Sequence, residues 1–141
     1  MCSLSQSLRG LSKQRGWKCM GKIPLEPVCD WDGVQCDGDF RVTGLYMHQR
    51  NLEGTISPHI NHLHRLRVLM LSENHLKGEI PAVHHLQHLQ VFDLHDNDLH
   101  GRPPPSLLNL DNIVKVDVAG NSELTGQSSS HHYASGTSTL F

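Results

Sequence analysis

Residues 69–81 read LMLSENHLKGEIP, and closely similar stretches recur on both sides of this segment. Residues 45–54 read LYMHQRNLEG, residues 92–101 read FDLHDNDLHG, and residues 116–126 read VDVAGNSELTG, with one extra residue before the last leucine. The four copies begin at positions 45, 69, 92 and 116, so the repeat lengths are 24, 23 and 24 residues. A fixed period of this size indicates a solenoid in which each copy forms one coil of a stack.

Each copy begins with a pattern typical of a short strand. The two leucines of Leu69-Met70-Leu71 are two positions apart, which is the period of a strand, so both side chains lie on one face. One such strand cannot bury its apolar face alone, but stacked coils form a parallel sheet over a continuous core. The residues that we expect to be buried between coils are Leu69, Leu71, Leu89, Phe92 and Leu94.

An asparagine recurs where each strand ends, at positions 74, 97 and 121, and Arg50 takes this position in the first copy. Its amide group can donate to and accept from backbone groups that the turn leaves unpaired. An ordinary turn asparagine would not recur in register. We therefore expect these side chains to hydrogen-bond to the backbone of their own and neighbouring coils. The outer segment that follows is expected to be extended and to need no regular pattern of backbone hydrogen bonds.

The frame L-x-x-L-x-L-x-x-N-x-L-x-G-x-I-P resembles the plant-type leucine-rich repeats of receptor kinases, receptor-like proteins and polygalacturonase inhibitors. Upstream, the sequence CDWDGVQC at residues 29–36 resembles the cap that precedes the first repeat in that family. Leu8, Leu11 and Trp17 resemble the helix of that cap and its following tryptophan. The resemblance implies that the chain is the cap and first repeats of such a protein.

The fold that follows is an α/β solenoid. It is a right-handed stack of about four coils of 23–24 residues, with a parallel concave sheet and a cysteine-containing amino-terminal cap. We assign residues 1–41 to the cap and residues 42–126 to the repeats. Residues 127–141 are rich in serine, threonine and histidine and are expected to form a disordered tail.

The cysteines all lie in the first quarter of the chain, which indicates a local staple or a small metal site. The resemblance implies a disulfide between Cys29 and Cys36 in an oxidising compartment. Cys2 and Cys19 form a second candidate pair, whose pairing stays open.

The resemblance also implies a function, because members of the family recognise their partners on the concave face. Alternation within each strand identifies the side chains on that face, and they grade from apolar to acidic along the stack. We expect a non-catalytic module that binds a protein or peptide through Tyr46, His48, Met70, Ser72, Glu73, Asp93, His95, Asp96 and Asp117.

The size of this surface limits what one chain can bind alone. Four strands about 4.8 Å apart make a sheet narrower than ~20 Å, and a strand of about five residues adds ~16 Å in the other direction. The resulting area of a few hundred square ångströms is smaller than the ~800 Å² per partner of a standard interface. The chain is therefore expected to be the start of a longer receptor-like protein, or to self-associate weakly through its uncapped last repeat. A self-assembling structural stack is a further alternative.

Composition narrows the remaining classes. With 12 Lys and Arg against 14 Asp and Glu, the charge gives no support for a nucleic-acid partner, and no run of 18 apolar residues is present to span a membrane. We find no arrangement of nucleophile and base and no cofactor motif, so we expect neither enzymatic activity nor a cofactor.

The chain contains 12 histidines, half of them in the outer connectors. His62 and His85 occupy equivalent positions in neighbouring coils, so a metal- or pH-responsive binding protein is the main alternative. No histidine recurs at a fixed spacing from a carboxylate or cysteine, so we assign no metal ligand and expect ordinary solvent-exposed side chains.

The compartment is expected to be extracellular or the cell surface, as the resemblance implies. The stretch from Met1 to Gly21 contains no apolar segment typical of a secretory signal, and the chain has no glycosylation sequon. A cytoplasmic location is therefore the alternative.

Overall fold

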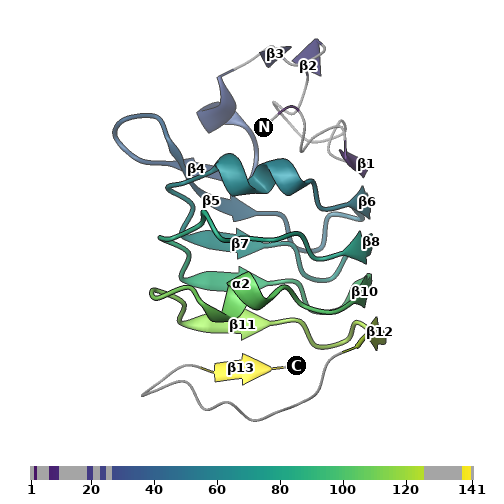
Figure 1. Ribbon diagram of the computed structural model, residues 1–141. Helices are drawn as coiled ribbons and strands as arrows, with labels where there is room; N and C mark the ends of the chain where they lie inside the picture. The colour runs from purple at the N-terminus through teal and green to yellow at the C-terminus, as the bar shows by residue number, and fades with distance from the viewer. Residues whose placement is uncertain are drawn as a thin grey trace.

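The computed structural model describes residues 27–125 without a gap, together with residues 2, 7–9, 19–20, 23–24 and 138–140. Successive coils of this part of the chain are stacked in one direction, with the cap at one end (Figure 1). The predicted solenoid of stacked coils is confirmed.

The concave face is a sheet whose strands follow the order β13-β11-β9-β7-β5-β4. The repeat strands pair in parallel with their side chains in register, whereas β4 belongs to the cap and runs antiparallel to β5. These strands are β4 (Val34–Cys36), β5 (Val42–Tyr46), β7 (Val68–Met70), β9 (Val91–Asp93), β11 (Lys115–Asp117) and β13 (Ser138–Leu140).

The segment after residue 126, expected to be disordered, lies outside the described residues except for β13. The backbone of β13 runs parallel to β11, at the end of the stack that the sequence analysis left open for self-association.

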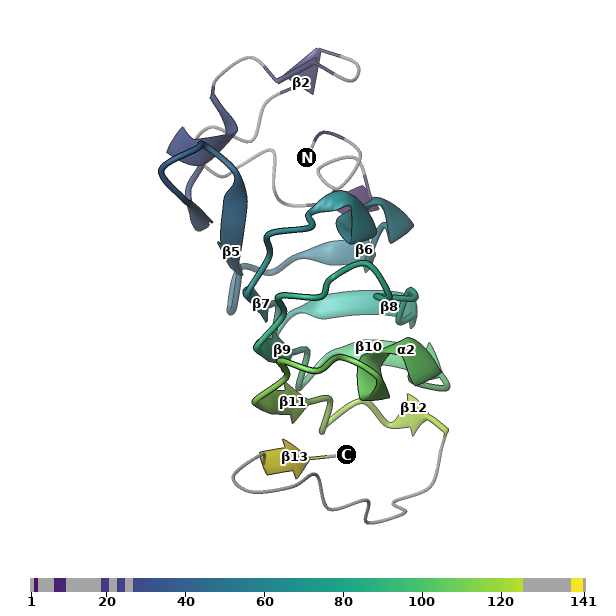
Figure 2. The ribbon, with the colours of Figure 1, turned by 60° about the vertical axis from the view of Figure 1, so that its left-hand side comes forward.

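The structure contains a second sheet that the sequence analysis did not predict. It has the order β1-β6-β8-β10-β12 and lies beside the first sheet (Figure 2). Coils held in register at one strand are also in register a few residues later, so their backbones pair again. Its strands are β1 (Leu8–Arg9), β6 (Glu53–Thr55), β8 (His75–Glu79), β10 (Asp98–Gly101) and β12 (Glu123–Leu124).

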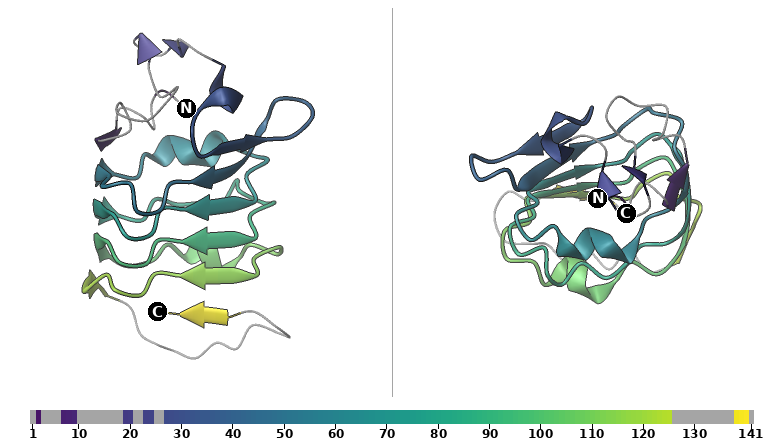
Figure 3. Two further views of the ribbon diagram at one scale, coloured as in Figure 1. Left: turned by 180° about the vertical axis from the view of Figure 1, so that it is seen from behind. Right: turned by 90° about the horizontal axis from the view of Figure 1, so that it is seen from above.

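The convex side is formed by connectors with little regular structure. The first holds the 3-10 helix η3 (Pro58–His62), whose first turn is capped by Ser57 because its hydroxyl oxygen accepts from the His59 amide at 3.3 Å. The third holds the short helix α2 (Pro105–Leu108), and residues 80–90 between them form no helix. Seen along the stack, these connectors lie opposite the concave strands (Figure 3, right).

The core between the two sheets is built from the apolar side chains of the repeats. All five residues predicted to be buried are at most 1% exposed, which confirms that prediction. Among the buried residues described in the repeats, Phe92 is the one aromatic side chain, and it takes in the third coil the position of Leu69 in the second. Continuous burial of this kind is what allows stacked coils to be stable when single coils are not.

Buried asparagines join each coil to the one before it. The Asn97 amide nitrogen donates to three carbonyl oxygens, those of Leu71 at 3.0 Å, Leu94 at 3.1 Å and His95 at 3.3 Å. Its oxygen accepts from the Leu76 amide at 2.9 Å. Asn74 and Asn121 repeat the arrangement in their coils, so the expected role of this position is observed.

The first coil has Arg50 in place of this asparagine, and Arg50 contacts both the second coil and the cap. The Arg50 amide donates to the Asn74 side chain at 3.0 Å, and the Arg50 guanidinium forms an ion pair with Asp32 of the cap. Trp31 is 2% exposed and extends the core beneath the first coil. Together these contacts close the amino-terminal end of the stack.

The cap also contains the predicted disulfide. Cys29 and Cys36 are bonded with their Cα atoms 5.7 Å apart, well within the usual range. Cys2 is disulfide-bonded as well. The other cap elements are β2 (Cys19–Met20), β3 (Ile23–Pro24) and the 3-10 helix η2 (Val28–Asp30).

Leu8 does not belong to a cap helix as expected, although Ser7 immediately before it is helical. Leu8 lies in β1, whose backbone pairs antiparallel with β6 and so covers the edge of the second sheet. Leu11 and Trp17, the other residues of that expectation, lie outside the described residues.

Replacing Asn97 with alanine should destabilise the fold strongly. The change leaves buried backbone groups of two coils without partners, and each such group costs about 1–3 kcal/mol. We expect a loss of at least about 2 kcal/mol in the free energy of unfolding, measured by denaturant titration.

The matched control is Asn109→Ala, because Asn109 is exposed at the end of α2. It should change the free energy of unfolding by less than about 0.5 kcal/mol. Equal losses in the two variants would show that the buried asparagine does not hold the coils together.

Candidate functional site

The concave sheet places equivalent residues of successive coils side by side. Tyr46 pairs with Met70, Met70 with Asp93, and Asp93 with Asp117. This column passes through the middle of the face and connects an apolar end near the cap with an acidic end. The predicted order along the stack is therefore present in the structure.

At the cap end, Tyr46 is held in a defined orientation. Its hydroxyl donates to the Gln35 side-chain oxygen at 2.9 Å, and Gln35 lies on β4 of the cap. Its ring lies across Gly44, where a Cβ atom would be only 2.6 Å from the Tyr46 Cε2 atom. Tyr46 and its neighbour Met70 are both half-buried, so they present an apolar surface in which the tyrosine ring is held in place.

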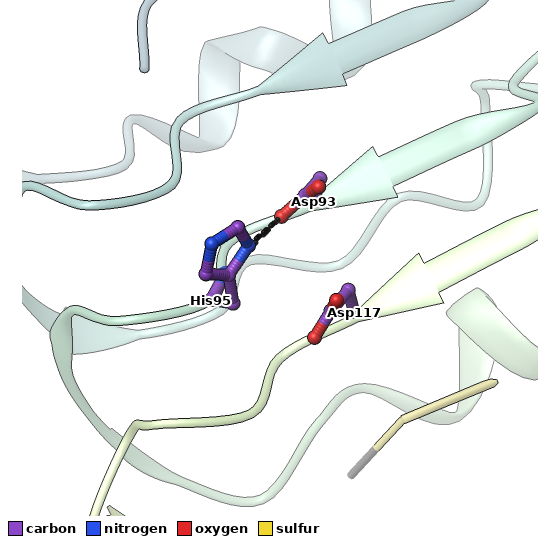
Figure 4. Close-up of side chains that lie close together, drawn as sticks. All are labelled: Asp93, His95 and Asp117. Carbon is purple, nitrogen blue, oxygen red and sulfur yellow. Dashed lines mark hydrogen bonds and ion pairs between the residues drawn. The ribbon is translucent and has the colours of Figure 1, made fainter. Parts of the chain in front are cut away.

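At the other end, four side chains form a bonded cluster. Asp93 accepts a hydrogen bond from Lys115 at 2.7 Å, and its other carboxylate oxygen lies 2.6 Å from the His95 Nδ1 atom (Figure 4). Lys115 also lies 3.6 Å from a carboxylate oxygen of Asp117. Asp93 is 1% exposed and Asp117 is 8% exposed, so both carboxylates are buried beneath the face.

The ionisation of this cluster follows from its contacts. Burial alone would raise the pKa of Asp93, but hydrogen bonds from Lys115 and His95 outweigh burial and lower it. Burial alone would lower the pKa of His95, but its bond to Asp93 and the charges of Asp117 and Asp96 raise it. The bond to Asp93 likewise raises the pKa of Lys115. The cluster therefore favours a buried carboxylate with cationic neighbours.

Acidic side chains remain exposed along one border of the face. Glu73 and Asp96 follow their strands with positive φ values of 55° and 52°, and Gln49 has 53° at the same position. Glu73 accepts a hydrogen bond from Gln49 at 2.6 Å and lies 3.9 Å from the His95 Nε2 atom. This border is thus built from one outward-facing polar residue in each of the first three coils, and Gly120 takes the position in the fourth.

The predicted binding residues fall into three groups by accessibility. Ser72, Asp93 and Asp117 are buried and offer almost no surface to a partner, because the cluster or the sheet covers them. The half-buried residues are Tyr46, Met70 and His95, and the exposed residues are His48, Glu73 and Asp96.

Sequence reasoning did not find Gln35 or Lys115 as parts of this site. Lys115 is aligned with Val68 and Val91 of the preceding coils. A charged residue at a position occupied by valine in those coils could have identified it as part of the site. Gln35 lies in the cap and has no equivalent in the repeats, so no pattern identified it.

The cluster has the donor atoms of a metal site, but its charge is already balanced. Asp93, His95 and Asp117 offer three ligand atoms within 4.8 Å of one another. The Lys115 ammonium contacts both carboxylates, so a cation would have to displace it. Among the described residues, the convex histidines form no comparable group of three.

Comparisons with known proteins agree with this fold. The family model described as "Leucine Rich Repeat" matches residues 65–84 and 88–110. Protein STRUBBELIG-RECEPTOR FAMILY 2 of Arabidopsis thaliana is 36% identical over 78 residues, covering 55% of this chain and 10% of that protein. The chain spans about a tenth of the length of the first curated relatives that it matches.

Two solved ectodomains from Arabidopsis thaliana have the same fold. The BIR2 ectodomain matches 84% of this chain and 65% of its own, with a TM-score of 0.72 and 27% identity. The ectodomain of the receptor kinase GASSHO1/SCHENGEN3 matches 83% of this chain and 14% of its own, with a TM-score of 0.73 and 31% identity. In the described part of the chain, no helix has the length and apolar character to cross a bilayer.

The His95–Asp93 pair should make stability depend on pH. Because the pKa of His95 is raised in the folded state, its contribution is complete below the ordinary histidine pKa of about 6.5 and is lost as the pH rises through the higher folded value. We expect His95→Gln to cost up to about 1 kcal/mol near pH 5.5 and less near pH 8.

Denaturant unfolding of both proteins across this range measures the difference. The control is His48→Gln, which changes an exposed histidine of the same face. A cost of His95→Gln that grows toward alkaline pH would contradict the assigned ion pair.

Proposed function

We propose that this chain, a plant-type leucine-rich-repeat protein, is a non-catalytic recognition module that binds a protein or peptide on its concave sheet. One observation carries the proposal. An apolar surface, formed by Tyr46 and Met70, continues on the same sheet into a border with the exposed carboxylates of Glu73 and Asp96. Rigid aromatic side chains beside charged groups are typical of residues that dominate binding.

The charges indicate the chemistry of the ligand. The carboxylates of Glu73 and Asp96 are exposed, whereas the ammonium of Lys115 is bonded to Asp93. A basic side chain beside an apolar one would satisfy both parts of this surface. The proposed ligand is therefore a polypeptide segment in which an arginine or lysine lies near an apolar residue.

The similar proteins support a role in recognition. The GASSHO1/SCHENGEN3 ectodomain was crystallised in complex with CASPARIAN STRIP INTEGRITY FACTOR 2. The relatives are much longer than this chain, and the concave sheet here has few strands. We propose that the chain contributes the first coils of a larger receptor-like surface and binds weakly alone.

The proposed compartment is extracellular or the cell surface. Cys29 and Cys36 form a disulfide, and such bonds persist in oxidising compartments. The similarity to receptor ectodomains favours the same location.

A peptide-display experiment tests the proposed function. A random peptide library is selected on the folded chain, and the enriched peptides are measured by calorimetry against variants. We expect enrichment of basic residues next to apolar ones, and Tyr46→Ala should weaken binding by more than about 1 kcal/mol. Tyr46→Phe should lose less, because it removes the bond to Gln35 but keeps the ring.

The control is the triple change of His84, His85 and His88 to alanine on the convex side, which should leave peptide binding unchanged. If that variant loses binding and Tyr46→Ala retains it, the concave sheet is not the recognition surface.

A further inference from the structure

The convex side carries a dense group of basic side chains that the proposed function does not use. Residues 56–67 and 80–90 contain six histidines and two arginines but no aspartate or glutamate. All eight basic side chains are exposed, unlike the carboxylates of the concave cluster. We call this group the convex histidine surface, and it consists of His59, His62, His64, Arg65, Arg67, His84, His85 and His88.

Neighbouring coils bring these side chains into contact. The His85 ring lies 4.1 Å from the His84 ring and 5.9 Å from the His64 ring of the preceding coil, centroid to centroid. The register is fixed by Asn61, whose side-chain oxygen accepts from the His85 amide at 2.9 Å. The histidines are thus held as a cluster by the stacking of the coils.

Arg65 and His88 form a contact that depends on protonation. The guanidinium of Arg65 lies 3.4 Å from the His88 Nε2 atom. A guanidinium only donates hydrogen bonds, so the imidazole nitrogen must be unprotonated to accept. Protonation of His88 removes this acceptor and leaves two cations side by side, which frees the Arg65 donors for an anionic ligand.

In the described part of the chain, the groups packed around the surface leave its charge uncompensated. A shallow cavity of about 230 Å³ at its cap end is lined by Arg41, His62, His64 and Arg65 over the apolar Val42 and Leu63. Arg41 is the member already paired, since it bonds to Asp37 and Asp39. The connector of the third coil, residues 103–114, has one carboxylate, that of the exposed Asp111. Its Ser106 and Asn112 side chains hydrogen-bond to the backbone of the connector at residues 80–90.

We infer that the convex histidine surface is a second binding site, gated by acid, for a linear polycarboxylate such as an acidic polysaccharide. Its charge rises from that of two arginines to that of eight basic groups when the histidines are protonated. Carboxylates with ordinary pKa values near 4 stay ionised while histidines take up protons, so attraction is strongest between these values. The site is distinct from the concave sheet and does not depend on the proposed function.

The composition of the surface favours this ligand over other polyanions. In the described residues, the exposed large apolar side chains are Phe40, Leu108 and Val114, and none belongs to the convex histidine surface. Peripheral binding to a bilayer uses apolar side chains that enter the interface. Binding of single-stranded nucleic acid uses aromatic platforms for the bases. A polycarboxylate needs only positive charge and hydrogen-bond donors, which this surface supplies.

The electrostatics of His85 agree with the inference. Desolvation is the largest cause that lowers the pKa of His85, and repulsion from His84, His64 and His62 lowers it further. A bound row of carboxylates would offset this repulsion, so binding should be accompanied by proton uptake. His85 should therefore take up its proton at a lower pH in the free protein than with an anion bound.

The test measures binding of polygalacturonate chains to the full chain by calorimetry in the presence of EDTA. We expect binding at about pH 5.5 to be at least about tenfold tighter than at about pH 7.5, and to weaken steeply with salt. The variant His64→Gln with His85→Gln should lose most of this gain and keep the weak binding at the higher pH. The matched control is His75→Gln with His100→Gln, which removes two exposed histidines from β8 and β10.

Several outcomes would overturn the inference. An unchanged pH response in the convex variant, or an equal loss in the matched control, would show that the convex histidine surface is not the site. Binding that is absent in EDTA but present when EDTA is left out would identify a metal bridge instead. Equally tight binding of neutral dextran, anionic phospholipid vesicles or single-stranded oligonucleotide at about pH 5.5 would reject a polycarboxylate site.

Discussion

Asn74, Asn97 and Asn121 each connect the backbones of two neighbouring coils through one buried side chain. Each amide satisfies several backbone groups that have no access to water, so the next coil can stack in only one register. Both sheets share that register, since β5 pairs with β7 and β6 pairs with β8 between the same two coils. The positions of side chains on the concave and convex sides are consequences of the same constraint.

The register produces two sides with opposite electrostatics. On the concave side, Asp93 is buried between Lys115 and His95, and it raises the pKa of both. On the convex side, His85 lies among other histidines with no carboxylate in its own or the preceding connector, and its pKa is lowered. The same type of side chain is therefore charged under different conditions on the two sides, which separates the proposed binding of a peptide from the proposed binding of an anionic polymer.

Repetition made much of this structure predictable from the sequence. The leucines and the recurring asparagine appear in fixed positions of the repeat, and the structure places them as expected. The bond between Cys29 and Cys36 was implied by the resemblance of the cap and is present. Contacts between particular side chains were not predictable in this way. The burial of Asp93 depends on Lys115 in the next coil, and the orientation of Tyr46 depends on Gln35 in the cap. The second sheet was missed because its strands carry no alternating pattern of their own and form only because the coils are in register.

The central claim is that the stacking of the coils sets the charge of each side, and one titration tests it most directly. Nuclear magnetic resonance resolves the ring protons of each histidine in a single sample, with assignments from His85→Gln and His95→Gln. The account predicts that His95 takes up its proton at a higher pH than a free histidine, whereas His85 does so at a lower pH. Equal midpoints, or the reverse order, would contradict it.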